Sequence, residues 1–145
     1  MAKRATSRSR KVNPVRKLAV EAARAADDNN AHEIVLLDLR GISPVTDYFV
    51  ICTGTSDRQM RTVAQEIMDC GESIDQKVWQ VAGMESADWI VLDFVDVVVH
   101  VFSEKLRHYY DLELIWGEAP RVRWQRRRSA RKAPPAGRGG SDAPE

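Results

Sequence analysis

Two short segments of the sequence carry residue types that could perform phosphate or metal chemistry. Residues 53–56 (TGTS) precede a helical pattern, and the amide groups at the start of a helix can bind a phosphate. With one glycine they match neither GxxxxGK(S/T) nor GxGxxG, so an ordinary strand-to-helix turn is the favoured interpretation. Asp93 and Asp96 lie near a turn and could hold a divalent cation. Residues three apart fall on opposite faces of a strand, and no third acid completes a fixed motif, so we expect no metal site.

The histidines and cysteines do not form a catalytic or zinc-binding pattern. His32, His100 and His108 have no zinc-type spacing with Cys52 or Cys70. His100 shares a strand face with apolar residues, which favours a packed, hydrogen-bonded histidine. Both cysteines lie in apolar segments, so we expect reduced, buried thiols in a cytosol-like compartment. The sequence contains no nucleophile elbow and no Ser/His/Asp arrangement, and we expect neither a cofactor nor enzyme activity.

Hydropathy patterns predict the elements that position these residues. An alanine-rich helix is expected over 15–28, and a second helix begins with the capping box of Ser56 and Gln59 and ends at Gly71. A last helix starts at residue 103 and leads into 112–116. The expected strands are 34–37, 48–52, 78–81, 89–94 and 96–102. The order α, β, β, α, β, β, β, α predicts a single compact α/β domain, a mixed β-sheet flanked by helices.

The strands also suggest where the sheet is buried and where it is open. Residues 48–52 are apolar on both faces, which predicts a central strand covered on both sides. Residues 89–94 and 96–102 are joined so tightly that they should form an antiparallel hairpin. Trp89 follows the polar residues 85–88, which suggests an exposed sheet edge and an aromatic side chain suited to a protein interface. We expect Trp79, Trp116 and Trp124 in the core or at its edge.

Charge is strongly segregated along the 145 residues, although the net charge is only +1. Residues 1–20 carry +7 and residues 121–145 carry +6, which leaves −12 on the 100 residues between them. We expect basic, disordered tails at 1–14 and 121–145 around one domain at 15–120. An acidic domain favours a basic protein partner, while the tails can contact RNA phosphates without sequence specificity. Equally, the tails can serve solubility or dock on the acidic domain.

The sequence also bears on location. No apolar run approaches the ~18 to 20 residues that a membrane span requires, and residues 1–20 lack the apolar centre of a secretory signal. The Arg/Ser-rich start is similar to an organelle transit segment. Because the C-terminal tail is equally basic, we favour the bacterial cytosol over an organelle matrix.

Four separated motifs, in this order, point to one known family. They are residues 47–56 with Gln59, 88–94, 96–102 and 110–116. They resemble the ribosomal silencing factor family, also called Iojap-like, and the resemblance covers about residues 15–117. It implies a fold similar to nucleotidyltransferases without their catalytic acids. It also implies binding to the large ribosomal subunit through its protein fourteen, which blocks joining of the small subunit and represses translation.

The resemblance further implies a contact surface on the strand that begins at Trp89 and on the turn after it. Its residues are Trp89, Asp93, Phe94 and Val95, with the two aromatic side chains as anchors. Many family members have Gly where this chain has Val95, and Glu-Gly where it has residues 82–83. Valine lacks the freedom of glycine to adopt positive φ, so the turn is expected to differ.

Two other functions are compatible with the residues. A nucleotide-binding, nucleotidyltransferase-like enzyme would use residues 53–56 with Asp93 and Asp96, and would require nucleotide and Mg²⁺. A nonspecific RNA-binding module would depend on the tails alone. An exposed strand edge is also compatible with a homodimer.

Overall fold

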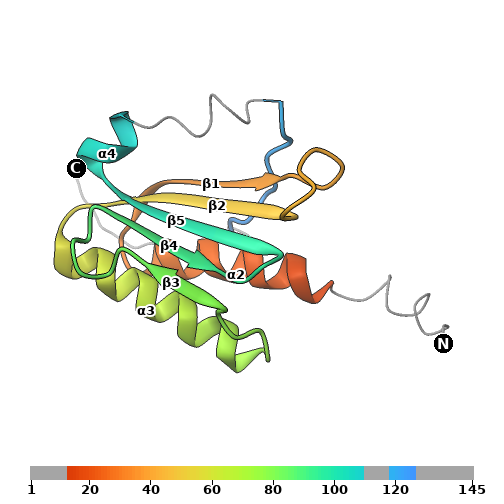
Figure 1. The fold of residues 1–145 in the computed structure, drawn as a ribbon, viewed down its shortest axis with the longest axis horizontal. Helices are drawn as coiled ribbons and strands as arrows, with labels where there is room; N and C mark the ends of the chain where they lie inside the picture. The colour runs from red at the N-terminus through yellow and green to blue at the C-terminus, as the bar shows by residue number, and fades with distance from the viewer. Residues whose placement is uncertain (1–12, 110–117, 127–145) are drawn as a thin grey trace, which may run out of the picture.

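The computed structural model describes residues 13–109 and 118–126, which form one sheet with helices packed on it (Figure 1). The strand order is β1-β2-β5-β4-β3, and β2 and β5 are parallel while the other neighbouring pairs are antiparallel. The order of helices and strands is the predicted one. The elements are α2 (Pro14–Asp28), β1 (His32–Asp38), β2 (Tyr48–Gly54), α3 (Asp57–Ser73), β3 (Gln80–Ala82), β4 (Trp89–Asp93), β5 (Val97–Ser103) and α4 (Glu104–Tyr109).

Local sequence signals set the starts of the two long helices. The Asn13 side chain accepts hydrogen bonds from the backbone N–H groups of Val15 and Arg16, and Pro14 occupies the first turn of α2. At the start of α3, Ser56 Oγ accepts from the N–H of Gln59 at 3.1 Å. The side chain of Gln59 in turn accepts from the N–H of Thr55 at 2.6 Å. The predicted capping interaction therefore fixes the point where α3 begins.

Gly71 does not end α3, contrary to the prediction, because the helix continues to Ser73. The glycine is buried, and a Cβ atom there would lie 2.5 Å from the carbonyl oxygen of Gln76 and 2.8 Å from the ring of Phe94. The lack of a side chain lets the backbone of α3 contact the aromatic ring directly. Close packing, rather than helix termination, accounts for this glycine.

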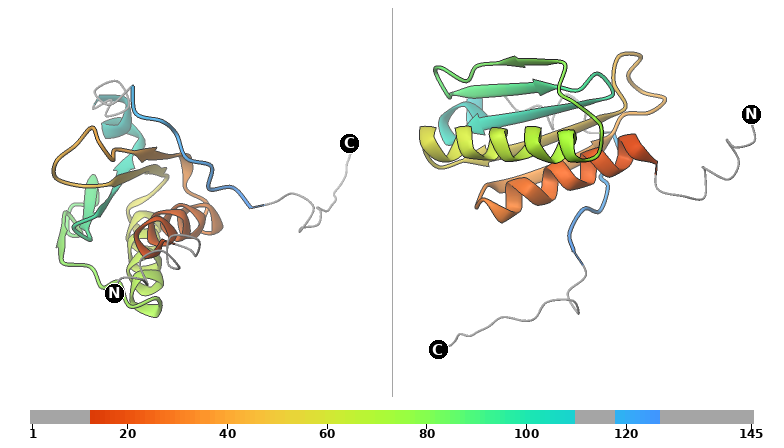
Figure 2. Two further views of the ribbon diagram at one scale, coloured as in Figure 1. Left: turned by 90° about the vertical axis from the view of Figure 1, so that its right-hand side faces the viewer. Right: turned by 90° about the horizontal axis from the view of Figure 1, so that it is seen from below.

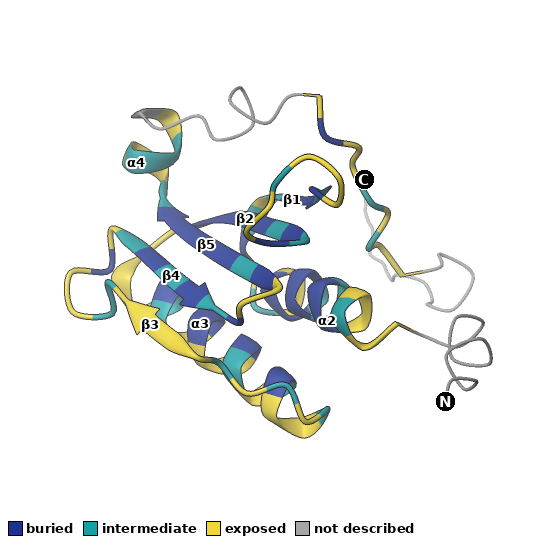
Figure 3. Cartoon of the chain, turned by 45° about the vertical axis from the view of Figure 1, so that its right-hand side comes forward, coloured by how far each residue is buried: buried dark blue, intermediate teal, exposed yellow. Residues whose placement is uncertain are grey.

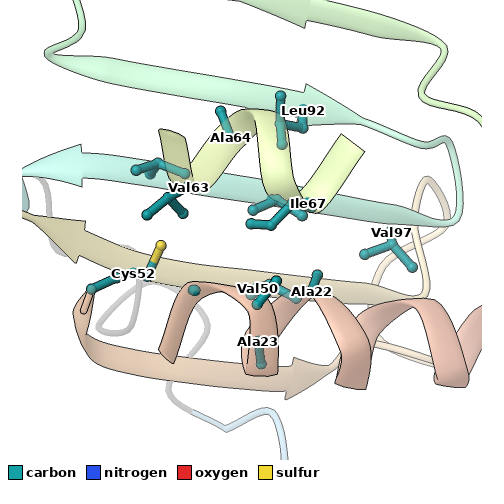
Figure 4. Packing of buried hydrophobic residues seen from close by; sticks show 14 of the residues in the cluster. Ala22, Ala23, Val50, Cys52, Val63, Ala64, Ile67, Leu92 and Val97 are labelled. Carbon is teal, nitrogen blue, oxygen red and sulfur yellow. The ribbon is translucent and has the colours of Figure 1, made fainter. Parts of the chain in front are cut away.

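The main core lies between the sheet and the two helices α2 and α3, which lie side by side on one face (Figure 2). The facing sides of the helices and the central strands are buried (Figure 3). Small residues of α2 and branched residues of α3 meet alternate residues of these strands (Figure 4). β2 is buried along nearly its whole length between β1 and β5, which confirms the predicted central strand. Residues labelled in the close view include Ala22, Ala23, Val50, Cys52, Val63, Ala64, Ile67, Leu92 and Val97.

The opposite face of the sheet carries a second, smaller cluster of apolar residues. Its buried members are Val35, Leu37, Leu39, Ile51, Phe102 and Ala119, with Phe49, Trp89 and Leu106 packed against them. α4 follows β5 directly and contributes Leu106 to this cluster. The segment predicted at 112–116 lies outside the described residues.

Residues 118–126, which we call the C-terminal strap, run along the outer side of β1. Arg121 forms an antiparallel bridge with Leu37, and the N–H of Val122 donates to the carbonyl of Leu36 at 2.8 Å. Trp124 packs against the main core, and Arg126 forms a bidentate ion pair with Asp28. The beginning of the expected C-terminal tail is therefore attached to the acidic domain.

The helices of the described residues are too short or too polar to cross a lipid bilayer.

Candidate partner-binding site

The turn between β4 and β5 is fixed by a dense set of hydrogen bonds. Asp93 Oδ1 accepts from the N–H of Val95 at 2.7 Å, and the N–H of Phe94 donates to the carbonyl of Val97 at 2.9 Å. The carbonyl of Asp96 accepts from the N–H groups of Asp47 and Tyr48 at 2.9 and 3.1 Å. The predicted antiparallel hairpin is confirmed. Because both sides of the turn are bonded, it presents its side chains in one geometry.

Val95 lies at the tip of this turn with its side chain 51% exposed. Its φ angle is +77°, in the left-handed region where a β-branched residue is strained. The turn thus keeps a conformation suited to glycine although the chain has valine there. The strain places an apolar side chain in solvent beside the carboxylates of Asp93 and Asp96.

Replacement of Val95 by glycine is expected to stabilise the protein by about 1 kcal/mol. Glycine adopts positive φ without the steric cost, which for other residues is ~1 to 2 kcal/mol, and part of that gain is offset by the larger entropy of the unfolded chain. Urea denaturation followed by circular dichroism measures the change. The matched control is Val45→Gly, at a more exposed valine whose φ is not positive. A Val95→Gly variant no more stable than the parent protein would contradict strain at this position.

Phe94 does not share the exposure of Val95. Its side chain is only 7% exposed and lies in the main core, against Gly71 of α3. It supports the turn from beneath, so the predicted role of an exposed aromatic anchor does not fit its position. The periodicity of β4 explains this, because Ile90, Leu92 and Phe94 all face the helices.

Trp89 is half-buried on the opposite face of the sheet. Its ring stacks on Phe102 with centroids 5.0 Å apart, and its Nε1–H donates to Nδ1 of His100 at 3.1 Å. β4 as a whole is not an edge strand, because β3 pairs with its residues 91–93, but the register of β3 ends at Val91 and does not reach Trp89. The polar residues 85–88 belong to the connection from β3 to β4. Trp89 therefore combines a partly accessible surface with a fixed ring orientation.

His100 is the packed, hydrogen-bonded histidine that the sequence predicts. Burial lowers its pKa to about 4, so the ring is neutral near pH 7. Since Nδ1 accepts the hydrogen bond from Trp89, the proton of the neutral ring belongs on Nε2. Nε2 is buried and has no hydrogen-bond partner. The imidazole is thus a structural group with an unsatisfied donor.

Trp79 is the aromatic residue that the sequence prediction missed. We expected it in the core or at its edge, but its side chain is 68% exposed. Its backbone N–H donates to the carbonyl of Asp93 at 2.8 Å, which places it beside the turn. Its short neighbouring strand β3 is exposed at all three positions. Because β3 begins only at Gln80 and is so short, its hydropathy pattern does not reveal that Trp79 is exposed.

The other groups that the sequence offered for phosphate, metal or thiol chemistry are bonded or buried within the domain. The N–H groups of Thr55 and Gln59 are bonded within the capping box, and a side chain at Gly54 would collide with Met60 and Gln59. Among the described residues, no three His, Cys, Asp or Glu side chains are grouped to hold a metal ion. Cys52 is fully buried, and burial raises the pKa of its thiol to about 12. Cys70 is half-buried, and burial is the main cause of its raised pKa.

Together, these features define a small α/β domain with a hydrogen-bonded turn that carries Asp93, Val95 and Asp96. A family model described as "Ribosomal silencing factor during starvation" matches residues 12–143. The chain belongs to the ribosomal silencing factor family. This family regulates translation in association with the ribosome, and it is not a family of enzymes.

Individual relatives agree with this assignment. A ribosomal silencing factor from Bacillus subtilis is 48% identical over 99 residues, covering 68% of this chain and 84% of that protein. The chloroplastic Iojap protein of Zea mays is 36% identical over 101 residues, covering 70% of this chain and 44% of the relative. A crystal structure of a Chromobacterium violaceum protein matches with a TM-score of 0.66 and 31% identity, over 74% of this chain and 87% of the other. A crystal structure of a Bacillus halodurans protein matches with a TM-score of 0.62 and 38% identity, over 75% of this chain and 96% of the other.

Proposed function

We propose that the protein binds the large ribosomal subunit through its protein fourteen and blocks association of the two subunits, which represses translation in the bacterial cytosol. The observation that carries the proposal is the rigid turn after β4, where two carboxylates flank an exposed apolar tip. Membership of the ribosomal silencing factor family supports the ribosome as the partner.

Charge supports a basic protein as the direct contact. Residues 21–120 carry a net charge of −12, and Asp47 is hydrogen-bonded to the turn that already holds Asp93 and Asp96. An acidic surface attracts a basic protein and repels the RNA around it, so electrostatics favours a protein patch over bare RNA at this turn.

The apolar groups of the site supply contact area. Val95 is exposed at the tip, and Trp79 adds apolar surface beside Asp93. Trp89 lies at the other end of β4 from the turn, where its ring is partly exposed. Phe94 holds the turn in place from the core. Aromatic side chains of limited mobility are typical of residues that dominate binding free energy. A protein held there on the large subunit would block the small subunit by steric exclusion.

The double variant Asp93→Asn, Asp96→Asn is expected to bind isolated large subunits about tenfold more weakly at low salt. Loss of two charges from the rim of an interface slows association and reduces the salt dependence of binding. Asparagine keeps the Oδ1 acceptor that Asp93 offers to Val95, so the turn is retained. Quantitative co-sedimentation with purified subunits measures the affinity.

The matched control removes the same charge from the exposed side of α3, with Glu66→Gln and Asp69→Asn. This variant should bind nearly as well as the parent protein. Equal weakening by the two double variants would mean that only net charge matters, and equal binding of the parent protein to small and large subunits would contradict the proposal. A pull-down with purified protein fourteen tests the direct contact.

A further inference from the structure

A second surface lies on the side of the domain where α2 lies beside the C-terminal strap. Arg24 Nε donates to the carbonyl of Trp124 at 2.7 Å, and Arg126 pairs with Asp28, so the two segments are joined at two points. Exposed basic side chains line both segments. They are Arg16 and Lys17 on α2 and Arg123 on the strap, and we call these three residues the basic ridge.

The strap is hydrogen-bonded to β1 at the end of that strand. The N–H of Asp38 donates to the carbonyl of Pro120, directly before Arg121. The pKa of the Asp38 carboxyl is lowered, chiefly by its hydrogen bond with Arg40, and the charge of Arg16 contributes.

Most acidic side chains beside the ridge are already paired. Asp38 is bonded to Arg40 at 2.8 Å, Glu21 lies 3.5 Å from Arg24, and Asp28 is held by Arg126. Asp27 and Glu118 are the other acids of the two segments. Because the carboxylates of Asp38, Glu21 and Asp28 are partly neutralised by these arginines, the ridge keeps a positive surface on a domain that is acidic as a whole.

The shape of α2 also suits a phosphate anion. A hollow of about 220 Å³ lies along the helix and is lined by Arg16, Lys17, Val20, Glu21 and Arg24. This is smaller than a typical ligand pocket of ~300 to 1,000 Å³, so it fits a phosphate group better than a whole nucleotide. Arg16 and Lys17 both lie in the first turn of α2, so they can contact the same phosphate group or two neighbouring ones.

We infer that α2 and the C-terminal strap together bind the phosphate backbone of RNA, independently of base sequence. The N-terminus of α2 lies at the same end of the domain as the turn between β4 and β5 (Figures 1 and 2). A protein patch at the turn and RNA on the ridge can therefore be contacted at one time. This inference goes beyond the proposed contact with protein fourteen and does not depend on it.

The test uses the full chain and a fluorescently labelled RNA hairpin, with affinity measured by anisotropy over a range of salt concentrations. The variant Arg16→Gln, Lys17→Gln, Arg123→Gln removes three exposed charges of the ridge. Each phosphate contact contributes a slope of about −0.7 to −0.9 to the logarithm of affinity against the logarithm of salt. We expect affinity to fall at least tenfold at about 50 mM salt and the slope to flatten by about 2.

A matched control removes three exposed charges from elsewhere on the domain, with Arg58→Gln, Lys77→Gln and Lys105→Gln. Its salt slope should equal that of the parent protein. Equal slopes for the two triple variants, or no binding of the hairpin by the parent protein, would overturn the inference. Binding of purified protein fourteen separates the two proposals. Suppose that the salt dependence of RNA affinity flattens only in the ridge variant, and that neither the parent protein nor any variant binds protein fourteen. The inference about the ridge is then supported, and the proposed function is contradicted.

Discussion

Replacement of Phe94 by alanine is expected to lower the free energy of unfolding by about 3 to 5 kcal/mol. The ring is 7% exposed, packs directly on the backbone of α3 at Gly71, and leaves a large cavity when it is removed. The main core surrounds it on the helix side of the sheet, and little relaxation is available because Gly71 lies within a regular helix. Urea denaturation monitored by circular dichroism measures the loss.

The control is Phe94→Leu, which keeps most of the buried volume and should cost under about 1.5 kcal/mol. A loss below 1 kcal/mol in the alanine variant would show that the ring is not part of the core. The outcome also bears on binding studies. Since Phe94→Ala removes support for the turn, the ribosome affinity of this variant must be calculated for its folded fraction only. Asp93→Asn keeps the acceptor for the Val95 N–H and avoids this correction.

Acidification from pH 7 to pH 5 is expected to cost the protein about 2 kcal/mol of stability through His100 alone. In the folded state burial lowers the pKa of this histidine to about 4, whereas in the unfolded chain it is near 6.5. Below pH 6.5 the unfolded chain binds a proton that the folded protein does not, so stability is complete above pH 6.5 and falls as the pH decreases toward 4. One unit of pKa difference corresponds to ~1.4 kcal/mol.

The measurement is the free energy of unfolding at several pH values for the parent protein and for His100→Gln. Glutamine can still accept the hydrogen bond from Trp89 but does not titrate. His32 and His108 are present in both proteins, so the difference between the two pH profiles isolates His100. Parallel profiles between pH 6.5 and 5 would refute the assignment of a buried neutral imidazole.

The sequence predicted the elements well wherever the signal was local. The capping box at Ser56, the doubly apolar run of β2 and the tight link between β4 and β5 each depend on neighbours within a few residues. Their positions in the structure agree with prediction to within about two residues. The strand order follows less directly from sequence, because β2 and β5 pair across the whole of α3, β3 and β4.

The candidate site was harder to predict because exposure depends on distant pairing. Trp89 begins a strand that β3 pairs with only at residues 91–93, and its ring is half-buried against Phe102, while Trp79 has an apolar neighbour in Val78 but is exposed. Phe94 and Val95 are adjacent apolar residues, but Phe94 continues the buried alternation of β4 while Val95 lies in the turn and is exposed. The strap is basic and polar, and its attachment depends on Leu36, Leu37 and Asp28 about 90 residues earlier.

The strap also has a consequence for self-association. Without it, the outer N–H and C=O groups of β1 would be open to strand pairing with another molecule, a common route to aggregation. Arg121 and Val122 occupy part of that edge, while the opposite edge is formed by β3, which is only three residues long. Segments as short as β3 offer little template for further strands. The C-terminal strap thus protects the edge of β1 from pairing with other molecules. We expect shortened forms of the protein to keep this protection only if they extend through Arg126, which holds the strap to Asp28.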